Sequence, residues 1–237
     1  MPTKTLAFYI LVIGIGLYAL NHKPAPRLKA PTTRAHSFTL NHAAIKRAKL
    51  FTVLISGEGF GSHGRGTGVL IDPTHVLTCA HVALMGQEET LVYFYPGYVL
   101  AKAHPVFASE AKDLAILELD VPVNGAPVPV FQENWTDGEP ITIMGNIMGC
   151  MKWFVGYGII SGSSGHFLLT DGLVKGGDSG GPWINEAGEV VAITDWGLET
   201  AKGQDVGISG GVSAKTVNAF LKSWKAPSIL DILTGAM

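Results

Sequence analysis

The chain has 237 residues, 47% hydrophobic and 15% charged, enough for one domain with a sizeable core and an extra segment. Its net charge of -2 conceals an asymmetry, because the first 50 residues hold eight Lys and Arg and no Asp or Glu, which indicates a basic tether before a mildly acidic globule. Two cysteines, Cys79 and Cys150, exclude a disulfide framework and favour free buried thiols over a bonded pair. No His or Cys spacing is typical of a metal site, so neither a metal nor another cofactor is expected.

Residues 5–20 form an uncharged apolar run, which as a helix would reach ~24 Å, slightly less than a ~30 Å hydrocarbon core. We predict an apolar N-terminal helix, a membrane anchor or signal segment, within residues 1–22. The small residues that could mark a cleavage site are poorly placed, which favours an uncleaved anchor over a cleaved signal, with a buried helix as the third alternative.

The orientation of this segment stays open. Four bases follow the apolar run and one precedes it, which favours a cytoplasmic C-terminal side, whereas export is the commoner fate of such a segment. We expect a membrane-anchored protein with its globular domain outside the cytoplasm, or a secreted one if a signal is cleaved.

Residues 23–49 are predicted to be a basic, proline-containing linker, with a short helix over 43–50. In residues 50–237, short apolar runs are broken by Gly, Pro, Asn and Asp, without helices between them, which indicates β-barrels or a sandwich. The predicted strands are 51–56, 68–71, 75–79, 90–95, 99–107, 114–119, 141–144, 154–161, 167–169 and 189–195.

The last predicted element is an amphipathic helix that begins after the N-cap candidate Ser213 and stops before Pro227. Its apolar side chains recur at positions i, i+3, i+4 and i+7, which are Val217, Phe220, Leu221 and Trp224.

The turn at residues 177–182, Gly-Asp-Ser-Gly-Gly-Pro, carries the main chemical signal. Its glycines let a substrate backbone come close and let N–H groups converge on one point. Such N–H groups stabilise the oxyanion that forms when a serine attacks a carbonyl. Gly-Ser-Gly turns are common in loops, however, so Ser179 is a candidate nucleophile only if a base and an orienting acid accompany it.

Both groups precede the serine in the chain. His81 follows the strand-like run 75–77, and Asp113 stands at the mouth of the apolar run 114–117. An imidazole accepts the serine proton, and a carboxylate fixes the imidazole tautomer and stabilises the imidazolium. Taken alone, His81 is more often structural and Asp113 more often a turn residue. The order His81, Asp113, Ser179 in a β-rich chain reverses those readings, because it is the chymotrypsin-type order.

With these motifs the chain resembles the trypsin-like serine proteases, and among them the HtrA/Deg catalytic domain, from about residue 51 to 224. Residues 145–149 and 158–162 resemble the start of that family's second barrel. The resemblance implies an all-β fold of two six-stranded antiparallel β-barrels with a C-terminal helix and the catalytic residues between the barrels. It also implies a protein or peptide substrate and an oxyanion hole formed by the N–H groups of Gly177 and Ser179.

Three features depart from the HtrA/Deg pattern. We expect no PDZ domain after the terminal helix. Asp178 stands where secreted trypsins bury an aspartate against an N-terminal amine and HtrA-type enzymes carry asparagine, so a buried Asp178 needs another partner. Asp195 aligns with a serine that touches the catalytic aspartate in trypsins, so either one carboxyl has a raised pKa or the register differs.

The resemblance also implies a substrate pocket with Leu173 near its base and Trp196 and Gly197 beside it. An apolar residue at the position of Leu173 favours aliphatic or small substrate side chains over Lys or Arg.

The leading hypothesis is a membrane-tethered serine endopeptidase that acts through an acyl-enzyme. The alternative is a catalytically inactive trypsin-like domain that binds peptides or scaffolds partners at the membrane. A nucleic-acid partner is not expected, because the basic segment 23–49 contains one aromatic residue, Phe38, and bases beside an apolar anchor more simply contact anionic lipid.

Overall fold

The computed structural model describes residues 41–58, 64–84, 89–96, 99–148, 151–199, 203 and 205–225. The chain divides into two compact units, residues 1–38 and 39–237, and every described residue belongs to the second unit. The predicted apolar helix within residues 1–22 lies outside the described residues. Among the helices that are described, none is long and apolar enough to cross a membrane.

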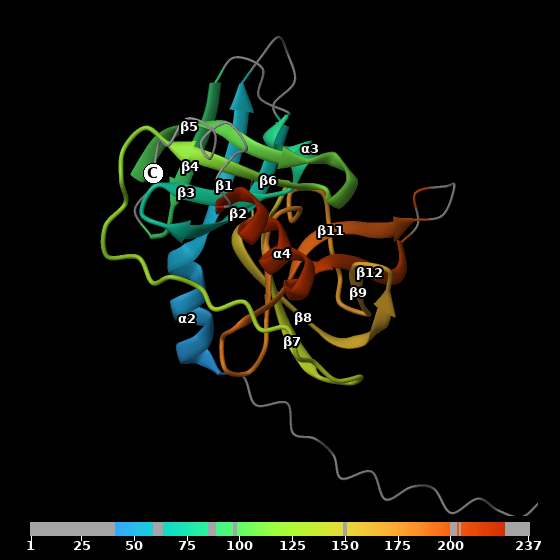
Figure 1. The fold of residues 1–237 in the computed structure, drawn as a ribbon. Helices are drawn as coiled ribbons and strands as arrows, with labels where there is room; N and C mark the ends of the chain where they lie inside the picture. Colours follow the sequence, from blue (N-terminus) through green and yellow to red (C-terminus); the bar gives the residue numbers. More distant parts are fainter. Residues whose placement is uncertain are drawn as a thin grey trace, which may run out of the picture. The chain divides into compact units, whose positions relative to one another are not determined.

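The described unit contains two closed antiparallel β-barrels of six strands each, which confirms the fold expected from the resemblance. The first barrel has the strand order β1-β2-β3-β6-β5-β4, and the second has the order β7-β8-β9-β12-β11-β10 read around the ring. The two barrels therefore share one connectivity. Figure 1 colours the first barrel from blue to green and the second from yellow to red.

The first barrel comprises β1 (Thr52–Glu58), β2 (Gly64–Asp72), β3 (His75–Thr78), β4 (Glu89–Phe94), β5 (Val99–Ser109) and β6 (Leu114–Leu119). The second comprises β7 (Pro140–Ile147), β8 (Met151–Ser164), β9 (Phe167–Thr170), β10 (Pro182–Ile184), β11 (Val190–Glu199) and β12 (Asp205–Ser213).

Two of these strands, β10 and β12, were not predicted. β10 has only three residues and starts with a proline, while β12 carries three glycines, so neither shows the alternating apolar pattern of a half-buried strand. Their pairing with longer neighbours on both sides makes them strands, since β10 pairs with β7 and β11, and β12 pairs with β9 and β11.

Two longer helices pack against the barrels. α2 (His42–Phe51) begins at Asn41, whose side chain accepts a hydrogen bond from the N–H of Ala44, and this confirms the predicted short helix. α4 (Ala214–Lys225) confirms the predicted terminal helix, and the hydroxyl of Ser213 accepts from the N–H of Thr216 at 3.4 Å. α4 contacts β11 and β12, and its Phe220 packs against Phe107 of the first barrel with ring centroids 5.1 Å apart.

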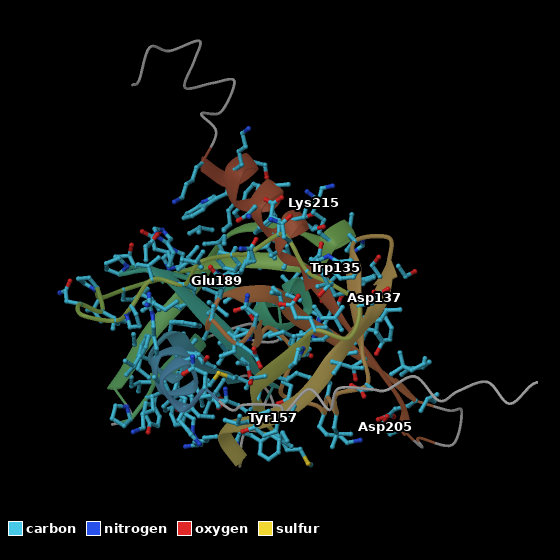
Figure 2. All side chains as sticks on the ribbon, turned by 90° about the horizontal axis from the view of Figure 1, so that it is seen from below. Trp135, Asp137, Tyr157, Glu189, Asp205 and Lys215 are labelled. Atoms are coloured by element: carbon cyan, nitrogen blue, oxygen red, sulfur yellow. The ribbon has the colours of Figure 1, made fainter. Side chains whose placement is uncertain are left out.

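The two barrels are joined by the segment between β6 and β7 and by direct contacts of β1 and β2 with β7. In the joining segment, Trp135 (labelled in Figure 2) packs against the apolar core of the second barrel. The Trp153 indole N–H donates to the carbonyl of Thr52 at 2.8 Å, and the Asn146 amide donates to the carbonyl of Val53 at 3.2 Å. These buried hydrogen bonds fix the second barrel against β1.

Candidate active site

His81 is placed by the end of β3 and a single helical turn. β3 ends at Thr78, Cys79 is extended with φ -73° and ψ 148°, and α3 (Ala80–Ala83) follows. Ala80, Val82 and Ala83 are buried, which leaves His81 as the one member of the turn that faces outward. The core contacts of its neighbours therefore fix the imidazole at the surface of the first barrel.

Asp113 lies beside His81 because β3 and β6 are paired, with Thr78 opposite Ala115. Asp113 caps the short 3-10 helix η1 (Glu110–Lys112) in the left-handed region at φ 47° and ψ 47°. Its carboxylate accepts two hydrogen bonds from His81, from the backbone N–H at 2.9 Å and from Nδ1 at 2.6 Å. With Asp113 ionised, Nδ1 must carry the proton, so Nε2 is left as an acceptor.

The pKa values of this pair follow from the same contacts. Burial raises the pKa of Asp113, but the hydrogen bonds from the His81 side chain and N–H outweigh it and hold that pKa at about 2. The hydrogen bond to Asp113 raises the pKa of His81, against an opposing effect of burial. The pair thus consists of a firmly ionised carboxylate and an imidazole with increased basicity.

The serine turn is fixed by hydrogen bonds from both barrels. Gly177 and Gly180 have φ values of +99° and +87°, and a Cβ at either position would overlap backbone atoms. The N–H of Thr67 donates to the carbonyl of Ser179 at 2.8 Å, and the Thr67 hydroxyl donates to the carbonyl of Gly177 at 2.7 Å. The N–H of Gly180 donates to the carbonyl of Thr194 at 2.8 Å.

Within this turn, the N–H groups of Gly177 and Ser179 donate to no acceptor in the part of the chain that is described. The other N–H groups of residues 177–182 are used: Asp178 donates to Lys175, Gly180 to Thr194 and Gly181 to Asp178. The two N–H groups expected to form an oxyanion hole are therefore those that the fold leaves available.

The Ser179 hydroxyl donates to the carbonyl oxygen of Asp195 at 3.2 Å. Within the described residues, no hydrogen bond joins Ser179 to His81. In structures without substrate, catalytic hydrogen bonds are often long or unmade. A rotation about the Cα–Cβ bond would release the hydroxyl from Asp195 for another acceptor.

Asp195 joins the pair of His81 and Asp113 as a third ionisable group. Cys79, His81, Asp113 and Asp195 each offer one side-chain S, N or O atom that could bind a metal ion, and these four atoms all lie within 4.8 Å of one another. Burial raises the pKa of Asp195, and the negative charge of Asp113 raises it further, to about 7. The register that the resemblance suggested for Asp195 therefore agrees with the structure, and one carboxyl has the raised pKa that two close carboxylates require.

We assign this group to acid–base chemistry and not to metal binding. The Cys79 thiol donates to the carbonyl of Thr194 at 3.1 Å, and burial followed by the charge of Asp113 raises its pKa well above the ordinary value. A metal ligand would be the thiolate, which this environment disfavours. Cys79 is free and buried, and Cys150 lies outside the described residues.

Asp178 is buried, with 2% of its surface exposed, and its Oδ2 accepts from the N–H of Lys175 at 2.9 Å. Among the residues that the structure describes, Oδ1 has no hydrogen-bond partner; it lies against Gly145, where a Cβ would overlap the carboxyl group. Burial raises the pKa of Asp178 to about 6. The partner that the sequence left unnamed is therefore the backbone N–H of Lys175, two residues before the serine turn.

The three residues predicted to form a substrate pocket come from two segments. Leu173 is half-exposed in the segment before the serine turn, and Gly197 is exposed on β11 opposite Ser209. The Trp196 indole packs over Gly210, which has no side chain to displace it, and meets the Phe167 ring edge-on with centroids 5.8 Å apart. Whether these residues select substrates stays a prediction.

Two residues that support the site, Thr67 and Asn146, were missed. The Asn146 amide donates to the Thr67 hydroxyl at 3.1 Å, so the two form one buried chain that ends at Gly177. The sequence feature that could have pointed to Thr67 is the pair of glycines on either side of it. The structure explains them: a Cβ at Gly66 would overlap Val82, and one at Gly68 would overlap Val76. Such glycines mark a strand that others approach closely.

A family model described as a trypsin-like peptidase domain matches residues 66–193. Among curated proteins, the chain is 31% identical over 142 residues to the peroxisomal leader peptide-processing protease of Mus musculus, which covers 54% of the chain and 25% of that protein. It is 26% identical over 209 residues to the serine endoprotease DegS of Escherichia coli, covering 78% of the chain and 56% of DegS. The chain thus spans about a quarter and about half of these relatives.

Among solved structures, the crystal structure of the serine endoprotease from Yersinia pestis is similar, with a TM-score of 0.67 and 26% sequence identity. The match covers 78% of this chain and 66% of that one. These similarities agree with the barrel topology and support a trypsin-fold domain of the HtrA/Deg kind.

Proposed function

Because this chain belongs to the trypsin-like peptidase family, we propose that it is a serine endopeptidase that hydrolyses peptide bonds through His81, Asp113 and Ser179. The observation that carries the proposal is the hydrogen bond of 2.6 Å between His81 Nδ1 and Asp113. It leaves Nε2 unprotonated, as a general base must be. The available N–H groups of Gly177 and Ser179 add the second requirement, a site for a developing oxyanion.

The proposed reaction begins when the Ser179 hydroxyl turns from Asp195 to His81. Nε2 takes the hydroxyl proton while Oγ bonds to the substrate carbonyl carbon, and the carbonyl oxygen becomes an oxyanion held by the two N–H groups. His81 then gives this proton to the leaving amine as the C–N bond breaks, which leaves an acyl-enzyme. Water then gives a proton to His81 and attacks the acyl carbon; the bond from this carbon to Oγ breaks, and His81 returns the proton to Oγ, which restores the Ser179 hydroxyl. Throughout, Asp113 stays ionised and stabilises the imidazolium.

A peptide substrate is proposed to lie along the end of β11. β10 pairs with β11 only as far as Ile193, whereas β12 pairs with it to Glu199. The stretch from Trp196 to Leu198 therefore has a strand on one side, and within the described residues no strand on the other. An extended peptide added there would form main-chain hydrogen bonds. Leu173, Trp196 and Gly197 would then contact the substrate side chain, with a preference for aliphatic or small residues.

The decisive experiment compares purified wild type, Ser179→Ala and Ser163→Ala, where Ser163 is an exposed serine of β8 and serves as the matched control. We expect a fluorophosphonate to label wild type and Ser163→Ala at Ser179, and only these two proteins to cleave an unstructured protein substrate. Equal cleavage by Ser179→Ala would refute the proposal. Peptide binding without turnover by wild type would favour the inactive peptide-binding alternative.

We also propose that residues 5–20 tether the enzyme to a membrane, with the catalytic domain outside the cytoplasm. Its support is the sequence alone: an uncharged apolar run followed by bases that suit anionic head groups. Carbonate extraction of membranes from cells that express the full chain tests it, combined with protease accessibility for the orientation. Recovery of a protein that starts after residue 20 from the medium would favour the secreted alternative.

A further inference from the structure

Asp195 owes its position to an irregularity in β11. In the pairing of β11 with β12, Thr194 is opposite Gly211 and Trp196 is opposite Gly210, so Asp195 is an extra residue with no partner. A β-bulge of this kind re-aims the side chain of the extra residue. Here the bulge brings the Asp195 carboxyl to the His81–Asp113 pair, within 4.8 Å of donor atoms of both.

Two carboxyl groups this close in a half-buried site cannot both be ionised unless a positive charge compensates them; otherwise one of them keeps a proton. The groups that face Asp195 are His81 and Cys79 from the start of α3, Asp113 from the turn before β6, and the Ser179 hydroxyl from the serine turn. β12 presents only Gly210 and Gly211 beside the bulge. Cys79 stays an uncharged thiol. Among these groups, only His81 can become a cation, by protonation of its imidazole.

We propose that Asp195 is a positioning residue that shares one proton with Asp113 and thereby sets the protonation of His81. This inference rests on the proposed function for its kinetic consequence, but not for its structural basis. When the proton lies on Asp195, its carboxyl group is neutral, can donate to Asp113, and leaves His81 uncharged and able to act as base. When the proton is lost, two negative charges face His81 and hold a proton on the imidazole, which stops it from accepting one from Ser179.

The same residue also contacts the serine. Its carbonyl oxygen accepts from the Ser179 hydroxyl at 3.2 Å, so the bulge places the backbone of Asp195 against Ser179 and its side chain against Asp113. The pKa of about 7 for Asp195 agrees with this geometry, because the exchange of the proton then falls in the range where His81 itself titrates.

The kinetic test measures kcat/KM against pH for wild type, Asp195→Asn and Asp195→Ser. Either variant removes the second negative charge, and asparagine keeps a donor toward Asp113 at nearly unchanged size. We expect the apparent pKa of the acidic limb to fall by about one unit in both variants, as the loss of a charge at this separation implies. At a pH well below this limb, kcat/KM divided by its plateau value should therefore be about tenfold higher in each variant than in wild type.

The matched control is Asp137→Asn, which removes one carboxylate from the exposed turn before β7 (labelled in Figure 2). It should leave the acidic limb of the profile where wild type has it. An equal shift in the control would assign the effect to net charge. An unchanged limb in both Asp195 variants, or a loss of activity that is uniform over pH, would overturn the proposal and leave Asp195 a structural residue.

A second readout does not depend on activity. In Ser179→Ala protein, NMR can follow the His81 ring and the Asp195 carboxyl carbon against pH. The proposal expects both signals to sense two coupled steps near neutrality, and only one step for His81 once Asp195→Asn is added. An Asp195 carboxyl that titrates below pH 5 would overturn it even if the enzyme proves active. Two coupled steps in this variant, together with a wild-type protein that has no protease activity, would instead reject the proposed function and keep the proton sharing.

Discussion

The hydroxyl of Thr67 donates a hydrogen bond to the carbonyl oxygen of Gly177 at 2.7 Å, from one barrel to the other. The N–H of Thr67 donates to the carbonyl of Ser179 at 2.8 Å. The peptide group between these two carbonyls carries the N–H of Ser179. One residue of the first barrel therefore fixes the direction of an N–H group that the proposed oxyanion hole requires.

Replacing Thr67 by valine should impair this arrangement. Thr67→Val keeps the shape but removes the donor to Gly177 and the acceptor for Asn146, both in a fully buried place. An unpaired buried polar group costs about 1–3 kcal/mol, so the free energy of unfolding should fall by that order. We expect kcat/KM to fall by about 10- to 100-fold, the loss that follows when an oxyanion donor is misplaced. Thr67→Ser, which keeps the hydroxyl, should stay close to wild type; equal activity of both variants would contradict the role given to this hydroxyl.

Gly145 should tolerate no side chain, because a Cβ at this position would overlap the Asp178 carboxyl group. Gly145→Ala would push Asp178 and the serine turn away from β7, and we expect at least tenfold lower kcat/KM together with a lower melting temperature. Gly176→Ala is the matched control, since a Cβ there meets nothing within 4 Å and its φ is not in the left-handed region. If both alanine variants behave alike, steric contact with Asp178 is not the reason for the glycine.

Asp113→Asn should test the tautomer argument. An amide at this position can donate to Nδ1, so that the proton moves to Nε2 and His81 no longer accepts from Ser179. Such a change lowers kcat by about 10⁴-fold in a Ser-His-Asp triad, and we expect a similar loss of cleavage here. Asp120→Asn, at an exposed acid just after β6, should keep full activity. A loss below about tenfold for Asp113→Asn would show that this carboxylate does not orient the base.

Much of the site could be predicted because its chemistry needs particular residue types in one chain order. His81, Asp113 and Ser179 were each ambiguous alone, and the structure brings the first two into contact through the pairing of β3 and β6. What the sequence lacked was the distance information that pairing supplies. The hydrogen bond of Ser179 to Asp195 depends on the bulge in β11, and no local sequence pattern predicts that bulge.

The fold was predictable in kind and incomplete in detail for a related reason. A strand such as β6 can be predicted because it is buried on both faces and its sequence is therefore a continuous apolar run rich in Leu and Ile. β10 and β12 do not, because they are strands by virtue of their neighbours. Thr67 was missed for the same reason: its importance lies in partners more than 100 residues away.

Asp178→Asn should change how stability depends on pH. The folded-state pKa of Asp178 is about 6, above the value of 3.8 for the free side chain, so the folded protein keeps a proton that the unfolded chain releases. Stability therefore falls as pH rises from about 4 to about 6, and the penalty is fully present above that range. Two pKa units correspond to roughly 3 kcal/mol, an upper value because the buried site can relax.

Urea unfolding at pH 4.5 and pH 8 measures this effect. We expect Asp178→Asn to gain about 1–3 kcal/mol relative to wild type at pH 8 and about a third of that gain at pH 4.5, because an amide carries no charge into the burial site while its oxygen can still accept from the N–H of Lys175. Asp137→Asn, with its exposed carboxyl, should leave the pH dependence as it is in wild type. A wild-type protein that is equally or more stable than Asp178→Asn at pH 8 would contradict the cost assigned here to the ionised Asp178 carboxyl group.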